Sequence, residues 1–291
     1  MKITRNVGIV ESITRKTFEE NYFNPQKPVV PRGLLKESPA MTKWNFPYFK
    51  EILGNLDVGI FDESFEKNDR SYKDPHYKMP FARYLDELAQ GPIKKRLFLF
   101  NPFKYHPALL QDFEFPKICS GFLKSFPFMF FGGDGAVTRI HQDMDMSCVF
   151  LTQFEGKKRV VLFDPRYSDL LYRLPMNVHT SVNINEPDYE KYPGLAYVEG
   201  QEVILEHGDT LFMPAGWWHH IEYIGSGFGM SMRCLSPHIR DILNGSLRVG
   251  VLTHLDELLL KMASRPWYHY KNQLASQRAN RKIKKLQQLV G

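Results

Sequence analysis

The sequence has few cysteines and no long apolar run, and each shortage excludes a class of protein. Only three cysteines occur in 291 residues, Cys119, Cys148 and Cys234, and this odd, scattered set argues against a disulfide framework or a thiolate zinc site. No apolar run approaches the roughly 20 residues that a membrane helix needs. Residues 1–20 are rich in charges and lack the apolar core of a secretory signal. We therefore expect a cytoplasmic protein.

The chain also lacks internal repeats and low-complexity linkers. Apolar residues make up 43% of the sequence and charged residues 24%, values that exclude a disordered chain, a collagen-like repeat and a coiled coil. The length is sufficient for a large buried core without disulfides or other cross-links. One compact domain with helical additions is the simplest organisation.

The positive charge of the chain is confined to its C-terminal end. The formal net charge is +6, but residues 261–291 hold eight Lys and Arg residues and no acid. The remaining 30 basic and 32 acidic residues leave 1–260 with a net charge of −2. We therefore read the C-terminal excess as a matter of partners or self-association, separate from the chemistry of the main domain.

Short apolar runs broken by Gly, Asp, Asn and Pro dominate residues 125–235, as is typical of an antiparallel sandwich or barrel. The expected strands are Arg96–Phe100, Phe126–Phe131, Cys148–Phe154, Arg159–Phe163, Glu202–Leu205, Thr210–Met213 and Phe228–Cys234. A helix is expected over 81–90, and amphipathic helices return after Pro237. Pro266 predicts a break between two C-terminal helices.

Three His-x-Asp triplets occur, where chance predicts about 0.5, so context must choose among them. His254 and Asp256 lie in a helical region, where residues two apart point in different directions, so we interpret them as a solvated helix face. His207 and Asp209 flank a glycine before a short strand, which favours a turn.

The triplet His141-Gln142-Asp143 precedes a strand-like run. If it is extended, both side chains point to the same face. A third ligand, His219, follows Gly208-Asp209 through a short strand and a Pro/Gly corner. Two histidines and one carboxylate form the facial triad that binds Fe(II) and leaves open coordination positions for catalysis.

Two blocks around these residues resemble the jumonji-C, cupin-like oxygenases. They are residues 137–163, with His141-Gln142-Asp143 and Gly156-Lys157-Lys158, and residues 208–219, from Gly208-Asp209 to Trp218-His219. The likeness is strongest to the branch of the asparaginyl hydroxylase that inhibits hypoxia-inducible factor, and a weaker similarity extends over 18–237. The resemblance implies a mainly β double-stranded β-helix (a jelly roll) over 1–237, followed by a basic helical extension over 238–291. It also implies Fe(II), O2 and 2-oxoglutarate as reactants.

The resemblance also assigns roles to individual residues. His141, Asp143 and His219 match the metal ligands, Lys158 matches the lysine that pairs with the far carboxylate of 2-oxoglutarate, and Thr138 matches a hydroxyl donor to that carboxylate. A buried dianion needs such a cationic partner. The departures from the family pattern are Phe98 in place of a tyrosine, Ser147 in place of an amide, and Val178-His179 in place of an Arg-Gln pair that grips substrate.

The roles of several neighbouring residues can be interpreted in two ways. Asp145 is either an acceptor that orients a ligand or an exposed acid, and Arg233 either reaches the pocket or pairs structurally. We expect Trp217 and Trp218 to serve packing more than substrate stacking. His220 should point away from the metal, because neighbouring strand residues alternate.

The leading hypothesis is an Fe(II)- and 2-oxoglutarate-dependent dioxygenase that hydroxylates an unidentified substrate. A protein or peptide side chain is favoured, and a small molecule stays open. The alternatives are a cupin-like binding module without turnover and an oxygenase directed at RNA or the ribosome, nucleic acid being the less favoured partner. The C-terminal helices suggest a homodimer, and no membrane partner is expected.

Overall fold

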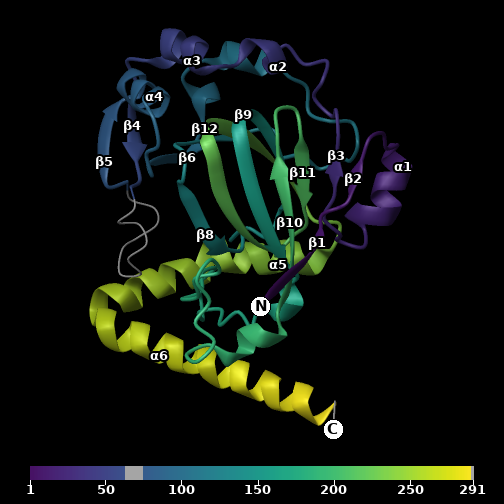
Figure 1. The fold of residues 1–291 in the computed structure, drawn as a ribbon, viewed down its shortest axis with the longest axis vertical. Helices are drawn as coiled ribbons and strands as arrows, with labels where there is room; N and C mark the ends of the chain where they lie inside the picture. The colour runs from purple at the N-terminus through teal and green to yellow at the C-terminus, as the bar shows by residue number, and fades with distance from the viewer. Residues whose placement is uncertain (63–74, 290–291) are drawn as a thin grey trace.

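A mainly β architecture is confirmed by the computed structural model, which describes residues 1–62 and 75–289. Eight strands form one sheet with the path β1-β10-β9-β12-β7-β6, with β11 paired to β9 and β8 paired to β12 (Figure 1). The strands are β1 (Lys2–Asn6), β6 (Arg96–Phe100), β7 (Phe128–Gly132), β8 (Val137–His141), β9 (Cys148–Phe163), β10 (Glu199–Leu205), β11 (Thr210–Met213) and β12 (Trp218–Cys234).

The two longest strands, β9 and β12, pair with each other along most of their length. The sequence predicts two strands, 148–154 and 159–163, where the structure has the single strand β9. Gly156 bends this strand: its φ is +69°, and a Cβ atom there would lie 2.6 Å from the Ser226 carbonyl oxygen. A glycine that looks like a strand end in the sequence is thus a bulge inside a curved strand.

Short helices cover the upper end of the large sheet in Figure 1, and small sheets lie at its two sides. The strands are β2 (Ile9–Val10), β3 (Val30–Pro31), β4 (Asp57–Ile60) and β5 (Tyr77–Pro80), and the helices are α1 (Arg15–Phe18), α2 (Ala40–Lys43), α3 (Phe46–Leu53) and α4 (Phe81–Ala89). Further single turns of helix span Glu19–Phe23, Pro102–Lys104, Pro107–Gln111, Pro165–Tyr167 and Pro193–Tyr197. The aromatic side chains fill this end, where Phe49 and Phe81 meet the ring of Phe131 edge-on.

The C-terminal helices lie at the opposite end of the sheet (Figure 1). They are α5 (Ile239–Leu247), a π-helical turn (Arg248–Leu252) and α6 (Thr253–Gln288), and none of the described helices is long and apolar enough to span a membrane. The predicted break falls at Ala263, whose φ of −149° and ψ of 55° are not helical. Beyond it, Ala275 and Ala279 pack against the apolar segment between β9 and β10.

One expectation about a single residue was wrong. Asp256 is not on a solvated helix face: its carboxylate is buried, lies 2.8 Å from Lys271 Nζ and accepts a 2.7 Å hydrogen bond from Trp267. The expectation failed because the helix break at Ala263 folds the second half of α6 back over Asp256. Its neighbour His254 is exposed, as predicted.

The three cysteines are scattered in the sequence but adjacent in the fold. Cys148 lies opposite Cys234 in the β9–β12 pairing, and the Sγ atoms of Cys119 and Cys234 are 3.5 Å apart. All three are buried free thiols. The sequence argument from their separation did not foresee this proximity.

Candidate metal centre and the adjoining cavity

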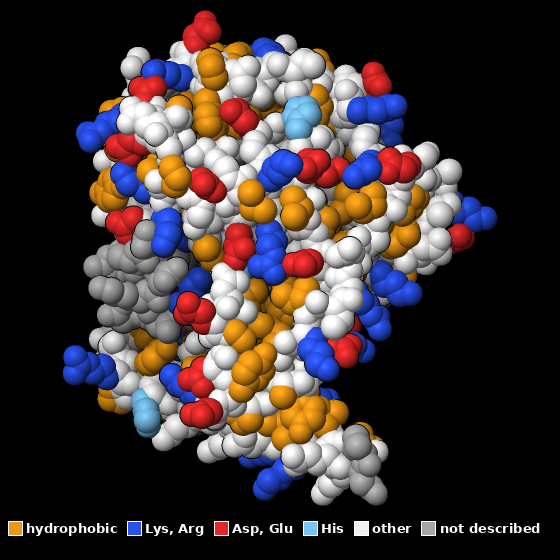
Figure 2. Space-filling view, viewed as in Figure 1, with side chains coloured by type: hydrophobic (Ala, Val, Ile, Leu, Met, Phe, Trp, Pro, Cys, Tyr) orange, Lys and Arg blue, Asp and Glu red, His pale blue; other side chains and the backbone are white. Residues whose placement is uncertain are grey.

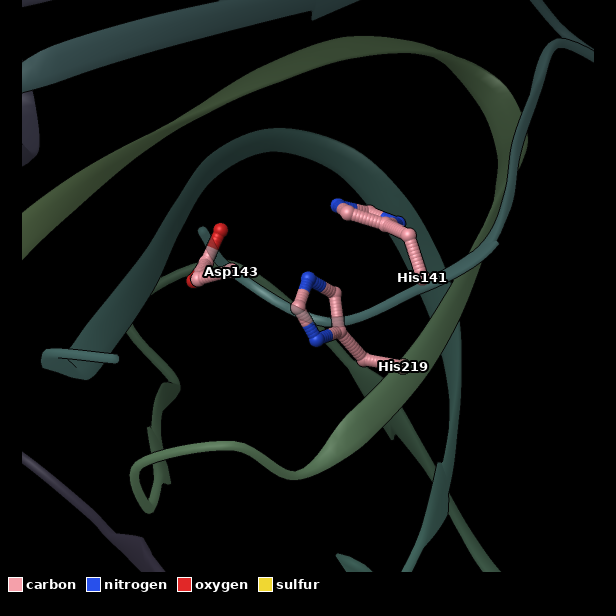
Figure 3. A group of neighbouring side chains, drawn as sticks. All are labelled: His141, Asp143 and His219. Carbon is pink, nitrogen blue, oxygen red and sulfur yellow. The ribbon is translucent and has the colours of Figure 1, made fainter. Parts of the chain in front are cut away.

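His141, Asp143 and His219 converge at one end of the sheet. His141 is the last residue of β8 and lies opposite His219 of β12, and Asp143 follows in the connection after β8. One ligand atom from each residue lies within 4.8 Å of the others, and Figure 3 shows the three side chains pointing toward one another. The extended triplet assumed from the sequence is therefore wrong in detail, because the strand ends at His141, two residues before the carboxylate.

Both imidazoles are oriented for ligation through Nε2. Nδ1 of His141 donates to the carbonyl of Arg139 at 2.8 Å, and Nδ1 of His219 donates to the carbonyl of Trp217 at 3.1 Å. Since a carbonyl only accepts, each Nδ1 carries a proton, and in the neutral ring this tautomer leaves the Nε2 lone pair for a metal. Burial and the neighbouring His219 hold the pKa of His141 well below its ordinary value, so the ring stays neutral, as a metal ligand must be.

Arg233 keeps the Asp143 carboxylate ionised. Burial by itself would raise the pKa of Asp143, but the charge of the Arg233 guanidinium, the largest opposing cause, helps to lower that pKa. Arg233 Nη2 donates to Asp143 at 3.2 Å, and its Nη1 donates to Asp145 at 2.9 Å and to Ser147 Oγ at 2.9 Å. Arg233 therefore takes the pairing role, one of its two interpretations, and lies beside the site. Asp145 belongs to the hydrogen-bond network that orients Arg233.

A buried positive charge, that of Lys158 on β9, marks a second region of the candidate site. Its side chain is 1% exposed, and burial lowers the pKa of its ammonium to about 7. The ammonium lies 4.7 Å from the ring centre of Tyr223, and a Cβ atom at Gly229 would approach Nζ to 2.9 Å, so only glycine leaves this space open. A buried cation whose pKa is lowered by desolvation suits an anionic ligand.

Arg96 on β6 completes this region, and sequence reasoning missed it. Its Nη1 donates to Thr138 Oγ1 at 2.7 Å, which leaves the threonine hydroxyl hydrogen available for another acceptor. Phe98 does not enter the region, because its ring packs against Phe61 with centroids 4.5 Å apart. The sequence did contain an indication of this role, because Arg96 is a charged residue at the start of the otherwise apolar strand Arg96–Phe100.

The remaining neighbours of the triad are structural, as expected. The indole of Trp217 donates to the carbonyl of Gln26, and that of Trp218 donates to Ser168 Oγ. His220 is buried and bonds to Glu222 rather than contributing to the triad.

An open cavity of about 1360 Å³ adjoins the triad. Its wall includes Gln142 and Met144, the sequence neighbours of Asp143, and His179, whose ring centre is 5.9 Å from that of His141. Three acids line it, Asp169, Asp256 and Glu257. Nine basic residues line it: Arg139, Arg166, Arg173, Arg240, Arg248, Lys261, Arg265, Lys271 and Arg278.

The interpretation that the basic C-terminal segment is separate from the active region was wrong, because part of that segment lines the cavity. Lys261, Arg265, Lys271 and Arg278 belong to that segment, and α6 brings all four into the cavity wall. By contrast, Lys and Arg side chains are interspersed with Asp and Glu on the face drawn in Figure 2.

The fold and the site together define an Fe(II)- and 2-oxoglutarate-dependent dioxygenase built on a cupin-like double-stranded β-helix. The chain belongs to the cupin-like domain family, whose model matches residues 15–235. It is therefore an enzyme rather than a binding module, and the suspected jumonji-C relationship is confirmed.

The named relatives include tRNA wybutosine-synthesizing proteins and lysine-specific demethylases. The chain is 28% identical over 252 residues to tRNA wybutosine-synthesizing protein 5 of Homo sapiens, covering 79% of this chain and 77% of that protein. The Gallus gallus protein of the same name is 28% identical over 253 residues, with 80% and 77% coverage. Lysine-specific demethylase 8 of Xenopus tropicalis is 28% identical over 226 residues, which are 74% of this chain but only about half (49%) of the relative.

Proposed function

We propose that His141, Asp143 and His219 hold Fe(II), and that Lys158 and Thr138 hold the far carboxylate of 2-oxoglutarate. The donor set, the Nε2-directed imidazoles and the buried ammonium all suit these groups. When bound, iron, 2-oxoglutarate and O2 supply the oxidation of a substrate C–H bond with release of succinate and CO2. The chain itself keeps the ligands in their binding protonation states and neutralises the co-substrate.

We further propose that the substrate is an RNA nucleotide. The observation that carries this proposal is the cavity beside the triad, whose wall holds nine basic and three acidic residues. Such a lining attracts phosphates and repels a cationic lysine substrate. The lining therefore favours an RNA substrate, as in the name of the tRNA wybutosine-synthesizing relatives, over a lysine side chain, as in the name of the lysine-specific demethylases.

The test is 2-oxoglutarate turnover by the full chain with Fe(II), in the presence of a tRNA pool or of a lysine-containing peptide. We expect RNA to stimulate succinate formation, His141→Ala and Asp143→Ala to abolish it, and the stimulation to fall steeply with salt. Stimulation by the peptide and not by RNA would overturn the RNA proposal. Undiminished turnover in both variants would overturn the metal assignment.

A homodimer through the C-terminal helices, the division at residue 237 and a cytoplasmic location remain predictions. The dimer is supported by exposed apolar side chains that follow one another along α5 and the start of α6. They are Ile239, Leu243, Leu247, Leu258 and Met262. Sedimentation of the full chain should give a dimer that Leu243→Asp converts to a monomer, and a monomeric parent chain would refute the idea.

A further inference from the structure

Three arginines from separate segments meet at one side of the cavity. Arg173 lies between β9 and β10, Arg248 begins the π-helical turn after α5, and Arg278 lies on α6. Arg278 Nη2 donates to the backbone carbonyl of Arg173. Burial and the neighbouring Arg278 lower the pKa of Arg173, and burial and Arg173 lower the pKa of Arg248 to about 10. Arg173 therefore lies close enough to both Arg278 and Arg248 for their charges to interact.

Among the described residues, no carboxylate forms a close ion pair with this cluster. Asp169 acts on Arg173 and Asp241 acts on Arg248, but no ion pair within 4.0 Å joins any of the three arginines to a carboxylate. Nη1 of Arg248 and Nε of Arg278 are buried without a hydrogen-bond partner. Buried donors that lack an acceptor cost free energy, and adjacent like charges add to that cost.

Another basic residue of α6, Lys271, shows how a structural cation is paired in this fold. Lys271 also lines the cavity, but its ammonium is paired with Asp256 at 2.8 Å. Lys271, which has a structural role, is thus ion-paired with a carboxylate. The three arginines have no carboxylate within 4.0 Å among the described residues. All three arginines line a space large enough for a ligand.

We propose that Arg173, Arg248 and Arg278 form a binding site for a phosphate group of the substrate. Guanidinium groups bind phosphate oxygens through paired hydrogen bonds, and three of them match a doubly charged group better than a single carboxylate. The site is separate from the 2-oxoglutarate pocket, because Lys158 does not line the cavity. The inference rests on the proposed RNA substrate and adds the anchor that would position a nucleotide beside the triad.

The test compares two substitutions on one helix. Arg278→Gln removes a member of the cluster, and Arg281→Gln removes an exposed arginine three residues further on that does not line the cavity. Calorimetry on the full chain at constant ionic strength uses inorganic phosphate, a nucleoside 5′-monophosphate and the matching nucleoside. We expect the monophosphate to bind at least about tenfold more tightly than the nucleoside, Arg278→Gln and Arg248→Gln to weaken it about tenfold or more, and Arg281→Gln to leave it unchanged.

Folding of the variants is checked by thermal unfolding without ligand. Removing one of three repelling charges should leave the melting temperature equal or higher, and added phosphate should raise it in the parent chain and not in Arg248→Gln. Equal losses in Arg278→Gln and Arg281→Gln would overturn the site, because they would indicate general charge attraction.

The two proposals can fail separately. RNA-stimulated turnover that is undiminished in Arg278→Gln would overturn the phosphate site and leave the RNA substrate standing. Phosphate binding that is lost in Arg278→Gln, without any stimulation of turnover by RNA, would support the site and overturn the RNA substrate.

Discussion

Replacing Lys158 by methionine should stabilise the ligand-free enzyme while abolishing its binding of 2-oxoglutarate. Burial lowers the pKa of this lysine from 10.5 to about 7 in the folded chain. The unfolded chain keeps the ordinary pKa, so between pH 7 and pH 10.5 it binds the proton more tightly than the folded chain does. The folded state therefore loses stability as the pH falls through this window, and the loss is complete below about pH 7.

The size of the effect follows from these two pKa values. Each pKa unit is about 1.4 kcal/mol, so the charged lysine costs the folded state about 5 kcal/mol at pH 6 and about 2 kcal/mol at pH 9. Methionine has a similar length and no charge. We expect Lys158→Met to exceed the parent chain in free energy of unfolding by up to these amounts, with the larger gain at pH 6.

The assay is urea unfolding of both chains at pH 6 and pH 9, without metal or 2-oxoglutarate. Calorimetric titration of 2-oxoglutarate in the presence of Mn(II) follows separately. Lys157→Met is the matched control, because Lys157 is an exposed lysine paired with Glu206. A stability gain that does not grow toward pH 6, or an unchanged affinity for 2-oxoglutarate in Lys158→Met, would refute the reasoning.

Two further substitutions test residues that the fold places beside the site. Arg233→Gln removes the cation that keeps Asp143 ionised and should weaken Mn(II) binding by about 10–100-fold, and an unchanged titration would contradict its role. Asp256→Asn leaves Lys271 buried without its carboxylate and should cost about 3–5 kcal/mol in urea unfolding. The nearby exposed His254 serves as the control, and a His254→Ala loss of the same size would show that the buried pair is not the cause.

The elements that the sequence predicted well are those with local signals. Short apolar runs placed β6 and β11 at their observed bounds, and the apolar spacing of α4 was correct to one residue. His141 and Asp143 were identifiable because they are two residues apart, and His219 because it follows a Gly-Asp turn and a Pro/Gly corner. Gly156 misled because a bulge and a turn have the same local requirement, a positive φ.

By itself, the sequence determined the strand-rich class and pointed to the side chains of the candidate metal centre, because strand patterns and short motifs depend on residues close together in the chain. Only the tertiary structure decided which charges meet. Arg233 reaches Asp143 across 90 residues, Arg96 reaches Thr138, and the fold of α6 buries Asp256 and turns the basic C-terminal segment into the cavity wall. Such contacts depend on how strands pair and helices pack, and a charge count along the chain does not contain that information.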